Sequence, residues 1–339
     1  MINLLDLELF ELEELVLNLG EPKYRAKQIF QRLSKGIASI EEINNIPVSL
    51  KQKVSEIAEV QLPTVRRCQV SKDGTRKYLL EMSDGKQIES VFMKYKFGNS
   101  ICVSSQAGCR MGCKFCASGL LGLDRNLSAG EILGEIIAVE MDAGEKVSHV
   151  VVMGTGEPFD NYENLSKFIR IANSKDSLGL GMRNITVSTC GIVPMIDKFG
   201  DDFPQVNLAI SLHRTNDSGR SELMPINRKY GLEELISACR RYTEKTSRRI
   251  TFEYTLIKGE NDDAEAVREL AGLLKGMLCH VNLIPLNVVK ETGFETIGRS
   301  EAQKFCDSLE KKGIPATVRR ELGDDIDAAC GQLRLSKNQ

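Results

Sequence analysis

The chain has little that would place it in a membrane or outside the cell. None of its 339 residues belongs to an apolar run approaching the roughly 20 residues that a membrane-spanning helix needs. The opening segment, Met1 to Glu8, lacks a basic stretch followed by an apolar one, which is the pattern of an export signal. Neither a repeat of fixed period nor a low-complexity tract is evident. We therefore expect a globular cytoplasmic protein with no membrane association.

Net charge is also nearly absent. The 45 Lys and Arg residues are balanced by 47 Asp and Glu residues, so the field of the whole molecule does not indicate a polyanionic partner. Local stretches differ from this average, because residues 65–77 and 240–249 are both strongly basic. The first of them, from Arg66 to Lys77, predicts a surface that contacts the phosphates of a nucleic acid.

The ten cysteines show no disulfide framework. Thiols in a chain without an export signal are expected to stay reduced, and any disulfide between them should be transient and catalytic. Four of them are predicted to behave as small buried apolar residues: Cys68, Cys239, Cys279 and Cys306.

Hydrophobic periodicity divides the chain into four parts. Residues 1–60 have helical spacing and are expected to form a helical RNA-binding domain. Residues 61–95 contain two alternating segments around a Ser-Asp-Gly turn, which predict a small β-hairpin extension. Residues 96–325 alternate between helices and short apolar strands, and this pattern is typical of repeated βα units. Residues 326–339 form a C-terminal segment.

The third part is predicted to be an α/β domain in which six parallel strands form a partial (β/α)6 barrel. In such barrels the reactive groups gather at the C-terminal ends of the strands. A helix is expected to begin after Ser128, because Ser128 and Glu131 have the spacing of a capping box. The predicted strands are residues 101–104, 147–153, 184–188, 206–211, 250–256 and 281–284.

Three cysteines stand four and then three positions apart in one loop. This spacing lets Cys109, Cys113 and Cys116 hold three irons of a [4Fe-4S] cluster and leave the fourth iron open to a small molecule. The alternative is a structural zinc site with Cys102 as the fourth thiolate, although zinc ligands usually come as two separated pairs. An open iron indicates catalysis, whereas zinc would indicate stabilisation of the fold.

Polar residues follow the predicted strands. In the segment Gly154-Thr-Gly-Glu-Pro158, Gly156 permits close backbone approach and the Glu157 carboxylate can bind a cationic amine. His213 is either a ligand-binding residue or a hydrogen-bonded histidine at a strand end. The other residues expected to bind a cofactor at these strand ends are Ser188, Ser211, Leu212 and Asn287.

The C-terminal motif, residues 323–333, places Cys330 among small residues that would leave its sulfur accessible. A buried structural thiol is the other interpretation. The acidic residues before it lack the spacing of a calcium loop and are expected to cap or brace a helix.

Together these motifs resemble those of a known family. The cysteine loop with Phe115 before its last cysteine is similar to the signature of radical S-adenosylmethionine (SAM) enzymes, in which Gly156 and Glu157 would bind the amino group of SAM. The full set resembles the RlmN/Cfr family of radical-SAM RNA methyltransferases over nearly the whole chain. The resemblance implies two cofactors, a [4Fe-4S] cluster and SAM. It is carried by residues 102–106, 109–116, 154–158, 188–191, 211–213 and 323–333.

The resemblance also implies a route for the methyl group. One SAM molecule would methylate Cys330, and a second, bound to the open iron, would yield a radical that removes hydrogen from this S-methyl group. The carbon radical would then add to adenine as a protein–RNA crosslink. By position in the family pattern, Glu89 matches the base that removes the ring proton, and Cys102 matches the thiol that attacks the Cys330 sulfur. The resulting disulfide would be transient in a reducing cytosol.

The family makes two products, methylated at adenine C2 or at C8. Gly156-Glu-Pro158 followed by Asp160-Asn161 resembles the C2 branch, whereas the C8 branch, which confers antibiotic resistance, tends to have alanine after the glutamate. The implied partners are 23S rRNA at the peptidyl-transferase centre, adenosine 37 of tRNAs, and an electron donor such as flavodoxin or ferredoxin, with the chain acting as a monomer. Two other classes stay open: a radical-SAM enzyme acting on a small molecule, and a non-catalytic zinc-stabilised RNA-binding module.

Overall fold

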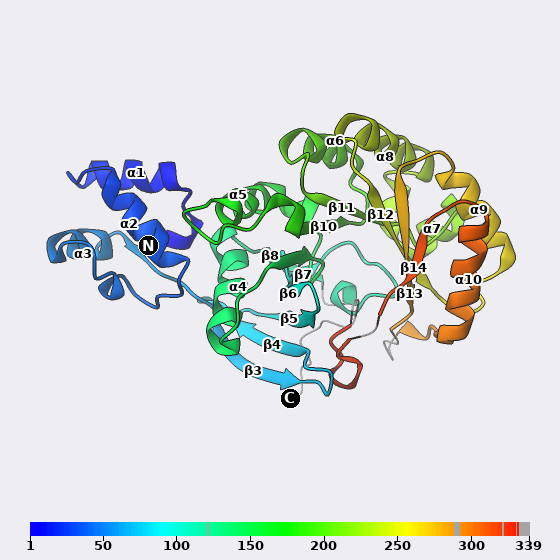
Figure 1. The fold of residues 1–339 in the computed structure, drawn as a ribbon, viewed down its shortest axis with the longest axis horizontal. Coiled ribbons are helices and arrows are strands. Elements are labelled where there is room, and N and C mark those ends of the chain that lie inside the picture. Colours follow the sequence, from blue (N-terminus) through cyan, green and yellow to red (C-terminus); the bar gives the residue numbers. More distant parts are fainter. Residues whose placement is uncertain (121, 288–291, 321, 330, 332–339) are drawn as a thin grey trace.

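The computed structural model describes residues 1–120, 122–287, 292–320, 322–329 and 331 (Figure 1). In this part of the chain no helix is long and apolar enough to cross a membrane. The helices are α1 (Leu9–Asn18), α2 (Tyr24–Leu33), α3 (Val48–Ser55), α4 (Ala129–Ala143), α5 (Tyr162–Asn173), α6 (Val193–Asp202), α7 (Asp217–Leu223), α8 (Leu232–Thr246), α9 (Ala264–Leu274) and α10 (Arg299–Lys311). The strands are β1 (Ile2–Asn3), β2 (Ala58–Glu59), β3 (Thr64–Val70), β4 (Arg76–Glu81), β5 (Gln87–Tyr95), β6 (Gly98–Val103), β7 (Gln106–Cys109), β8 (Gly122–Asn126), β9 (His149–Val152), β10 (Ile185–Thr189), β11 (Asn207–Ser211), β12 (Ile250–Leu256), β13 (Cys279–Pro285) and β14 (Ala316–Val318).

Helices α1, α2 and α3 form a group at one side of the molecule (Figure 1). Their apolar faces are buried, with Leu12 and Leu50 fully enclosed. An ion pair between Lys167 and Glu11, with the nitrogen and oxygen 2.7 Å apart, joins this group to α5. The predicted helical character of residues 1–60 is confirmed, while their RNA-binding role stays a prediction.

A ten-stranded sheet forms the centre of the molecule, in the order β14-β13-β12-β11-β10-β9-β6-β5-β4-β3. All neighbours from β14 to β6 are parallel, and helices cover the outer face of this part (Figure 1). The six predicted parallel strands are confirmed as β6 and β9 to β13. The prediction omits β14, because its three residues are too few to show a period.

The predicted hairpin is confirmed as β4 and β5, with Gly85 in its turn at φ +80°. It is nevertheless continuous with the barrel sheet, because β5 pairs antiparallel with β6 and places Val91 opposite Cys102. The turn signal in the sequence is a local feature and does not show what the hairpin pairs with. In the structure the pairing of β5 with β6 joins the hairpin to the edge of the barrel sheet. This pairing carries β5 to the site described below.

Helix α4 follows the cysteine loop and begins at the predicted capping box. The Ser128 hydroxyl accepts a hydrogen bond from the Glu131 N–H (3.1 Å), and the Glu131 carboxylate accepts one from the Ser128 N–H (2.9 Å). One turn later Glu135 is fully buried and accepts a hydrogen bond from the Ser104 N–H (3.0 Å). Burial raises the pKa of Glu135 well above its usual value, and its hydrogen bond with Ser104 braces the end of β6.

Three of the four cysteines predicted to be buried are so: Cys239, Cys279 and Cys306. The fourth prediction is wrong, because Cys68 is only half-buried. It lies on β3, the edge strand of the sheet, where one face of the strand meets solvent.

Candidate active site

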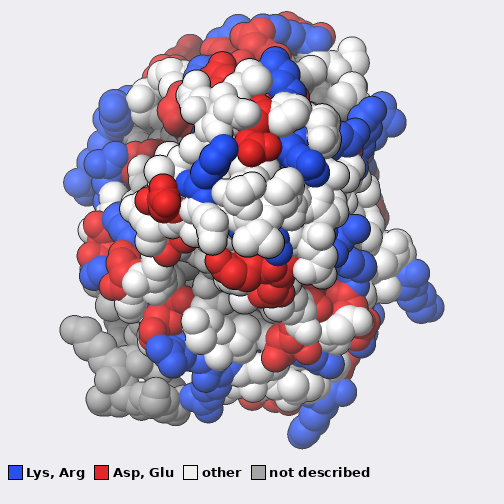
Figure 2. Space-filling model, turned by 90° about the vertical axis from the view of Figure 1, so that its left-hand side faces the viewer, with Lys and Arg blue, Asp and Glu red and all other residues white. Residues whose placement is uncertain are grey.

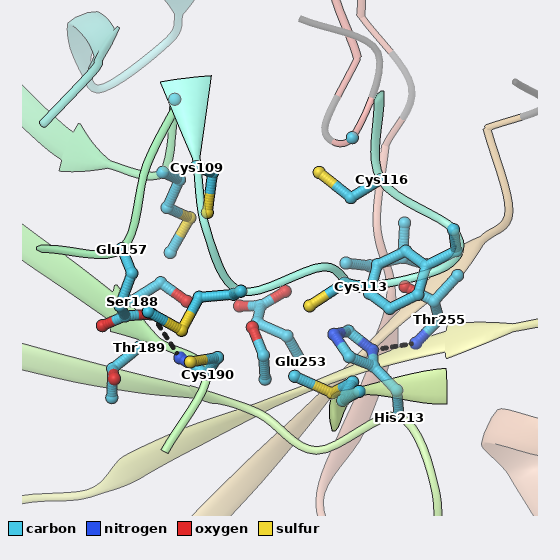
Figure 3. A pocket seen from close by; sticks show the side chains of 18 of the residues that line it. Cys109, Cys113, Cys116, Glu157, Ser188, Thr189, Cys190, His213, Glu253 and Thr255 are labelled. Atoms are coloured by element: carbon cyan, nitrogen blue, oxygen red, sulfur yellow. Dashed lines mark hydrogen bonds between the residues drawn. The ribbon is translucent and has the colours of Figure 1, made fainter. Parts of the chain in front are cut away.

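The C-terminal ends of the parallel strands surround a cavity of about 160 Å³ (Figure 3). Segments far apart in the sequence meet here, as expected for strand ends in a parallel barrel. The predicted site residues that line the cavity are Cys109, Cys113, Cys116, Gly156, Glu157, Ser188, Ser211, His213 and Asn287.

The cysteine loop closes one side of this cavity, and its three sulfur atoms surround a common space (Figure 3). Backbone hydrogen bonds hold the loop, with the Lys114 N–H donating to the Leu223 carbonyl (3.0 Å) and the Cys116 N–H donating to the Cys113 carbonyl (3.2 Å). The loop is thus shaped by the protein itself, and the thiols need not be gathered by a bound metal.

Burial dominates the electrostatics of the thiols. Burial, together with the neighbouring charges of Glu157 and Cys116, raises the pKa of Cys109 to about 11. It also raises the pKa of Cys113, again with a contribution from Cys116 and Cys109. A bound cationic centre would reverse this balance by displacing the thiol protons.

The donor set also bears on the kind of metal centre. In the described part of the chain, no three His, Cys, Asp or Glu side chains converge closely enough to hold a single metal ion. A zinc ion needs its ligands to converge on one point, whereas the thiolates of a cluster bind different irons. The three cysteines therefore fit a cluster better than a zinc site.

Glu157 forms the wall opposite the cysteine loop. Its carboxylate accepts hydrogen bonds from the Cys190 N–H (2.7 Å) and the Phe159 N–H (3.0 Å). Burial raises the pKa of Glu157, and these hydrogen bonds only partly offset that effect. A cationic amine bound in the cavity would stabilise the carboxylate, which supports the predicted contact with an amino group.

Two glycines let this wall approach the cysteine segment closely. A Cβ on Gly154 would lie 2.7 Å from the Val103 carbonyl oxygen, and one on Gly156 would lie 2.6 Å from the Gln106 Cβ. The buried Gln106 side chain fastens the two segments together, because its oxygen accepts a hydrogen bond from the Glu157 N–H (2.8 Å). The glycines are therefore required for packing as well as for access to the cavity.

The first expected outcome follows from this packing. Gly156 has φ +106°, so Gly156→Ala should lower the free energy of unfolding by about 3 kcal/mol or more through backbone strain and overlap, and SAM binding should be lost. Gly179→Ala is the matched control, because Gly179 also has a positive φ (+66°) but has open space around its Cβ position. Gly179→Ala should lower the free energy of unfolding by only about 1–2 kcal/mol. Urea unfolding and isothermal titration with SAM measure both effects, and equal losses in the two variants would contradict this account.

His213 lies at the end of β11 with a positive φ of 57°. Its Nδ1 accepts a hydrogen bond from the Thr255 N–H (3.0 Å), and its ring contacts Phe115 of the cysteine loop edge-on, with centroids 4.7 Å apart. Burial lowers the pKa of His213 to about 3 and the charge of Arg220 contributes, so the imidazole is neutral. Its Nδ1 thus serves the fold, which leaves Nε2 as the atom able to donate to a ligand.

Leu212 differs from the other predicted cofactor-binding residues in the position of its side chain, while its predicted role stays a prediction. Its side chain is fully buried in the main hydrophobic core and is not among the described residues that line the cavity. Ser211 and His213 line the cavity, whereas the side chain of the residue between them packs in the core.

A second, smaller cavity adjoins the first. Cys102 is 6% exposed there, among Val91, Met93 and Ala328. Asn287 and Arg319 line both cavities. The other described residues of the second cavity are Tyr95, Met153, Ile284, Pro285, Arg320, Leu322 and Ala329.

The C-terminal motif lies against both cavities. Ala329 lines the cavity of Cys102, and Gly331 lines the cavity of the three loop cysteines. The Ala117 N–H, directly after Cys116, donates to the Gly331 carbonyl (2.8 Å). Cys330 itself lies outside the described residues. The acidic run does not cap a helix as predicted, since Asp325 instead accepts hydrogen bonds from the β3–β4 turn.

Glu89 lies on β5, on the same face as Val91 and Met93 of the second cavity, because residues two apart in a strand share a face. It is 8% exposed, and its Oε1 lies 3.6 Å from the Lys77 Nζ. This ion pair changes the prediction that all basic residues of 66–77 contact phosphates. Lys77 faces inward to Glu89, so its charge does not belong to an exposed surface.

Two family models match the chain. Residues 2–60 match the ribosomal RNA large subunit methyltransferase N-terminal domain, and residues 103–271 match the radical SAM superfamily. A probable dual-specificity RNA methyltransferase RlmN from Thermoanaerobacter sp. (strain X514) is 51% identical, over 98% of each chain. Another from Clostridium perfringens (strain SM101 / Type A) is 52% identical, over 99% of this chain and 97% of that one. The chain belongs to the RlmN family.

A solved structure agrees with this RlmN assignment. The crystal structure of a radical SAM methyltransferase from Sphaerobacter thermophilus has a TM-score of 0.94 and 45% identity, and the match covers 98% of this chain and 99% of that chain. Enzymes of this kind use a [4Fe-4S] cluster and SAM. The residues of the first cavity fit both groups, since three thiols face one space and a buried carboxylate lies beside close-packed glycines.

Two polar residues of this RlmN-family site are not predicted from the sequence. Glu253 is 5% exposed and lines the first cavity from β12, where burial raises its pKa. Arg220 is fully buried and donates to the carbonyls of Cys190 (2.7 Å) and Ser211 (3.0 Å), two residues of the cavity wall. A charged residue inside an apolar strand is the signal that could have identified Glu253. Arg220 lies on a polar helix and gives no comparable signal.

Proposed function

We propose that this RlmN-family chain methylates C2 of adenosine, both in 23S rRNA at the peptidyl-transferase centre and at position 37 of tRNAs. The observation that carries the proposal is the placement of the C-terminal motif. The residues on either side of position 330 line two different cavities, one with the three loop cysteines and one with Cys102. Cys330, the proposed methyl carrier, stands in the sequence between Ala329 and Gly331, each of which lines one of the two cavities.

The first cavity would hold the cofactors. Cys109, Cys113 and Cys116 would bind the cluster, and Glu157 would bind the amino group of SAM. When bound, the cluster and SAM supply the one-electron chemistry that activates an S-methyl group. His213, neutral and anchored through Nδ1, would donate from Nε2 to the ligand.

The second cavity would complete the transfer. Cys330 would carry the one-carbon unit and become linked through it to adenine. Glu89 would accept the ring proton, and the Cys102 thiolate would attack the Cys330 sulfur. The sulfur–carbon bond then breaks, a disulfide forms, and the freed carbon takes up a proton to become the methyl group. Thiol reductants of the cell would regenerate both cysteines.

The setting of Cys102 supports this role. Val91, Met93 and Ala328 surround it, so its thiol is shielded from solvent. A sulfur nucleophile enclosed in this way reacts only with a group delivered into the same cavity. The C-terminal segment, which contributes Ala328 and Ala329, is such a delivery route.

The partners follow from the reaction. The chain would act in the cytoplasm on rRNA and tRNA, with flavodoxin or ferredoxin as electron donor, and as a monomer. The names of the relatives and the match of residues 2–60 to a ribosomal RNA methyltransferase domain support the RNA substrates.

The proposed activity is tested by analysing the product. Anaerobically reconstituted protein is incubated with SAM, a reductant and either 23S rRNA or tRNA, and the RNA is digested to nucleosides for mass spectrometry. The proposal expects 2-methyladenosine in both RNAs. Formation of 8-methyladenosine would assign the chain to the C8 branch, and methylation of neither RNA would overturn the proposal.

RNA affinity should depend steeply on salt, because phosphate contacts release counterions. Charges of both signs mingle on the face that carries the N-terminal helices, so no broad basic patch dominates it (Figure 2). We expect Arg66→Glu combined with Arg67→Glu to weaken RNA binding about tenfold and to reduce the salt slope, with SAM cleavage in the absence of RNA unchanged. Filter binding at several salt concentrations measures this.

The matched control for this surface compares the single reversal Arg66→Glu with Arg241→Glu. Arg66 and Arg241 are similarly exposed (53% and 52%), and each pairs with one carboxylate, Glu81 or Asp197. Arg241 belongs to α8, so its reversal should leave RNA affinity unchanged. Equal weakening by both reversals would mean that the effect reflects net charge rather than a binding surface.

A further inference from the structure

The turn between β3 and β4, residues 71–75, holds the segment that leads to position 330. The Gly323 N–H donates to the Asp73 carboxylate (3.0 Å), although these residues are 250 positions apart. The Ser71 hydroxyl and the Lys72 N–H both donate to the Asp325 carboxylate, the latter at 3.3 Å. Figure 1 shows this segment beside the end of β3.

Asp73 is a charged anchor for both segments. One of its oxygens accepts a hydrogen bond from the Thr75 N–H (2.8 Å) and the other accepts the bond from Gly323. Slight burial raises its pKa, but these hydrogen bonds outweigh that effect and lower the pKa to about 2. The carboxylate is therefore ionised, which strengthens both bonds.

Close packing accompanies these hydrogen bonds. Gly323 has φ +68°, and a Cβ there would lie 2.7 Å from the Ala328 Cβ and 3.0 Å from the Thr75 Cγ2. Ala328 in turn packs in the cluster that contains Cys102. The turn thus fixes residues 323–328 against the wall of the second cavity.

Lys77, at the start of β4, connects this segment to the proposed base. Its Nζ lies 3.6 Å from the Glu89 Oε1 and 3.3 Å from the Asp327 carbonyl oxygen. Only 11% of the Lys77 side chain and 10% of the Glu89 side chain are exposed, so the contact is shielded from solvent. One ammonium group therefore touches both the carboxylate and the backbone three residues before Cys330.

The neighbouring turn shows that these bonds are not needed to make a hairpin. In the β4–β5 turn, the Asp84 carboxylate accepts a hydrogen bond from the Lys86 N–H (3.0 Å), just as Asp73 accepts one from Thr75. The second oxygen of Asp84 binds Arg125 (2.6 Å) and not the C-terminal motif. Asp73 and Asp84 thus have the same local role, and only Asp73 holds the segment before Cys330.

We propose that residues 71–77 form a clasp that positions the methyl-carrier segment, with Ser71 and Asp73 holding residues 323–325 and Lys77 aligning residue 327 with Glu89. The inference rests on the proposed role of Cys330 as carrier. Residues 71–77 act on the reaction only by holding the methyl-carrier segment, so they are positioning residues.

The clasp is tested without RNA by comparing Asp73→Ala with Asp84→Ala. Loss of the charged anchor should free the segment, so Cys330 should react with iodoacetamide about ten times faster in Asp73→Ala than in the wild type, as measured by peptide mass spectrometry. S-methylation of Cys330 by SAM should fall in the same variant. Cluster content should stay unchanged in both, and Asp84→Ala should match the wild type in reactivity and methylation.

Lys77 is tested by a pair of substitutions. Lys77→Met should leave cluster content and Cys330 methylation intact but lower RNA methylation about tenfold or more, and Lys77→Arg should restore most of it because the cation is kept. Failure of Lys77→Arg to exceed Lys77→Met would remove Lys77 from the clasp.

Two further results separate this inference from the proposed function. Equal Cys330 alkylation rates in Asp73→Ala and Asp84→Ala overturn the clasp, whatever the activity of the enzyme. A wild-type protein that methylates RNA without methylating Cys330 overturns the carrier role, and the alkylation rates then still decide whether residues 71–75 hold the segment.

Discussion

Cys102→Ala protein should accumulate a covalent protein–RNA adduct and release no methylated RNA. In the proposed mechanism the adduct forms through Cys330, and its breakdown needs a thiol that attacks the Cys330 sulfur. Cys102 is the buried thiol that shares a cavity with Ala328 and Ala329, so its removal should block release without blocking attachment. A denaturing gel should show a slow-migrating band that disappears on nuclease treatment.

Three comparisons make this result specific. Cys330→Ala, and the double variant that combines Cys102→Ala with Cys330→Ala, should form no adduct, because no carrier is present. Cys306→Ala, which removes a thiol of similar burial (3% against 6% exposed) from the packing of α10, should turn over normally. The same band in all of these variants, or its absence from Cys102→Ala, would show that release does not depend on Cys102.

Cys113→Ala should lose the iron–sulfur cluster and with it all SAM cleavage. Cys113 stands in the middle of the loop, and its sulfur faces the same space as those of Cys109 and Cys116 (Figure 3). Without it a second iron of the proposed cluster would have no thiolate, and the cluster would lose a third of its protein ligands. Iron and sulfide content, the brown chromophore and 5′-deoxyadenosine release measure the effect after anaerobic reconstitution.

Cys190→Ala is the matched control for this loss. Cys190 lines the same cavity and is 6% exposed, but it lies at the end of β10 beside Glu157 and outside the loop. The variant should keep its cluster. A cluster of full occupancy in Cys113→Ala, or its loss in Cys190→Ala, would mean that a different set of thiols holds the irons.

Local patterns predict much of the fold and the site. The spacing of Cys109, Cys113 and Cys116 needs only one loop to bring them together, and the capping box at Ser128 is complete within four residues. The location of residues at strand ends is also well predicted from the sequence, because parallel strands in one barrel must end on the same side. Glu157 and His213 meet in the cavity for this reason.

Non-local contacts explain what the sequence does not predict. The identity of Lys77 suggests a phosphate contact, and only the pairing of β4 with β5 shows that it faces Glu89. Likewise the acidic residues before Cys330 reveal their role only beside Ser71, which is 254 positions away from Asp325.

The central claim is that the transferred carbon passes through Cys330, and the mass of one peptide tests it most directly. Wild-type protein with its cluster is incubated with SAM and reductant in the absence of RNA, alkylated, digested and analysed. We predict that the peptide containing Cys330 gains one methyl group, whereas the peptides containing Cys102 and Cys190 gain none. An unmethylated Cys330 in protein that goes on to methylate RNA would contradict the account.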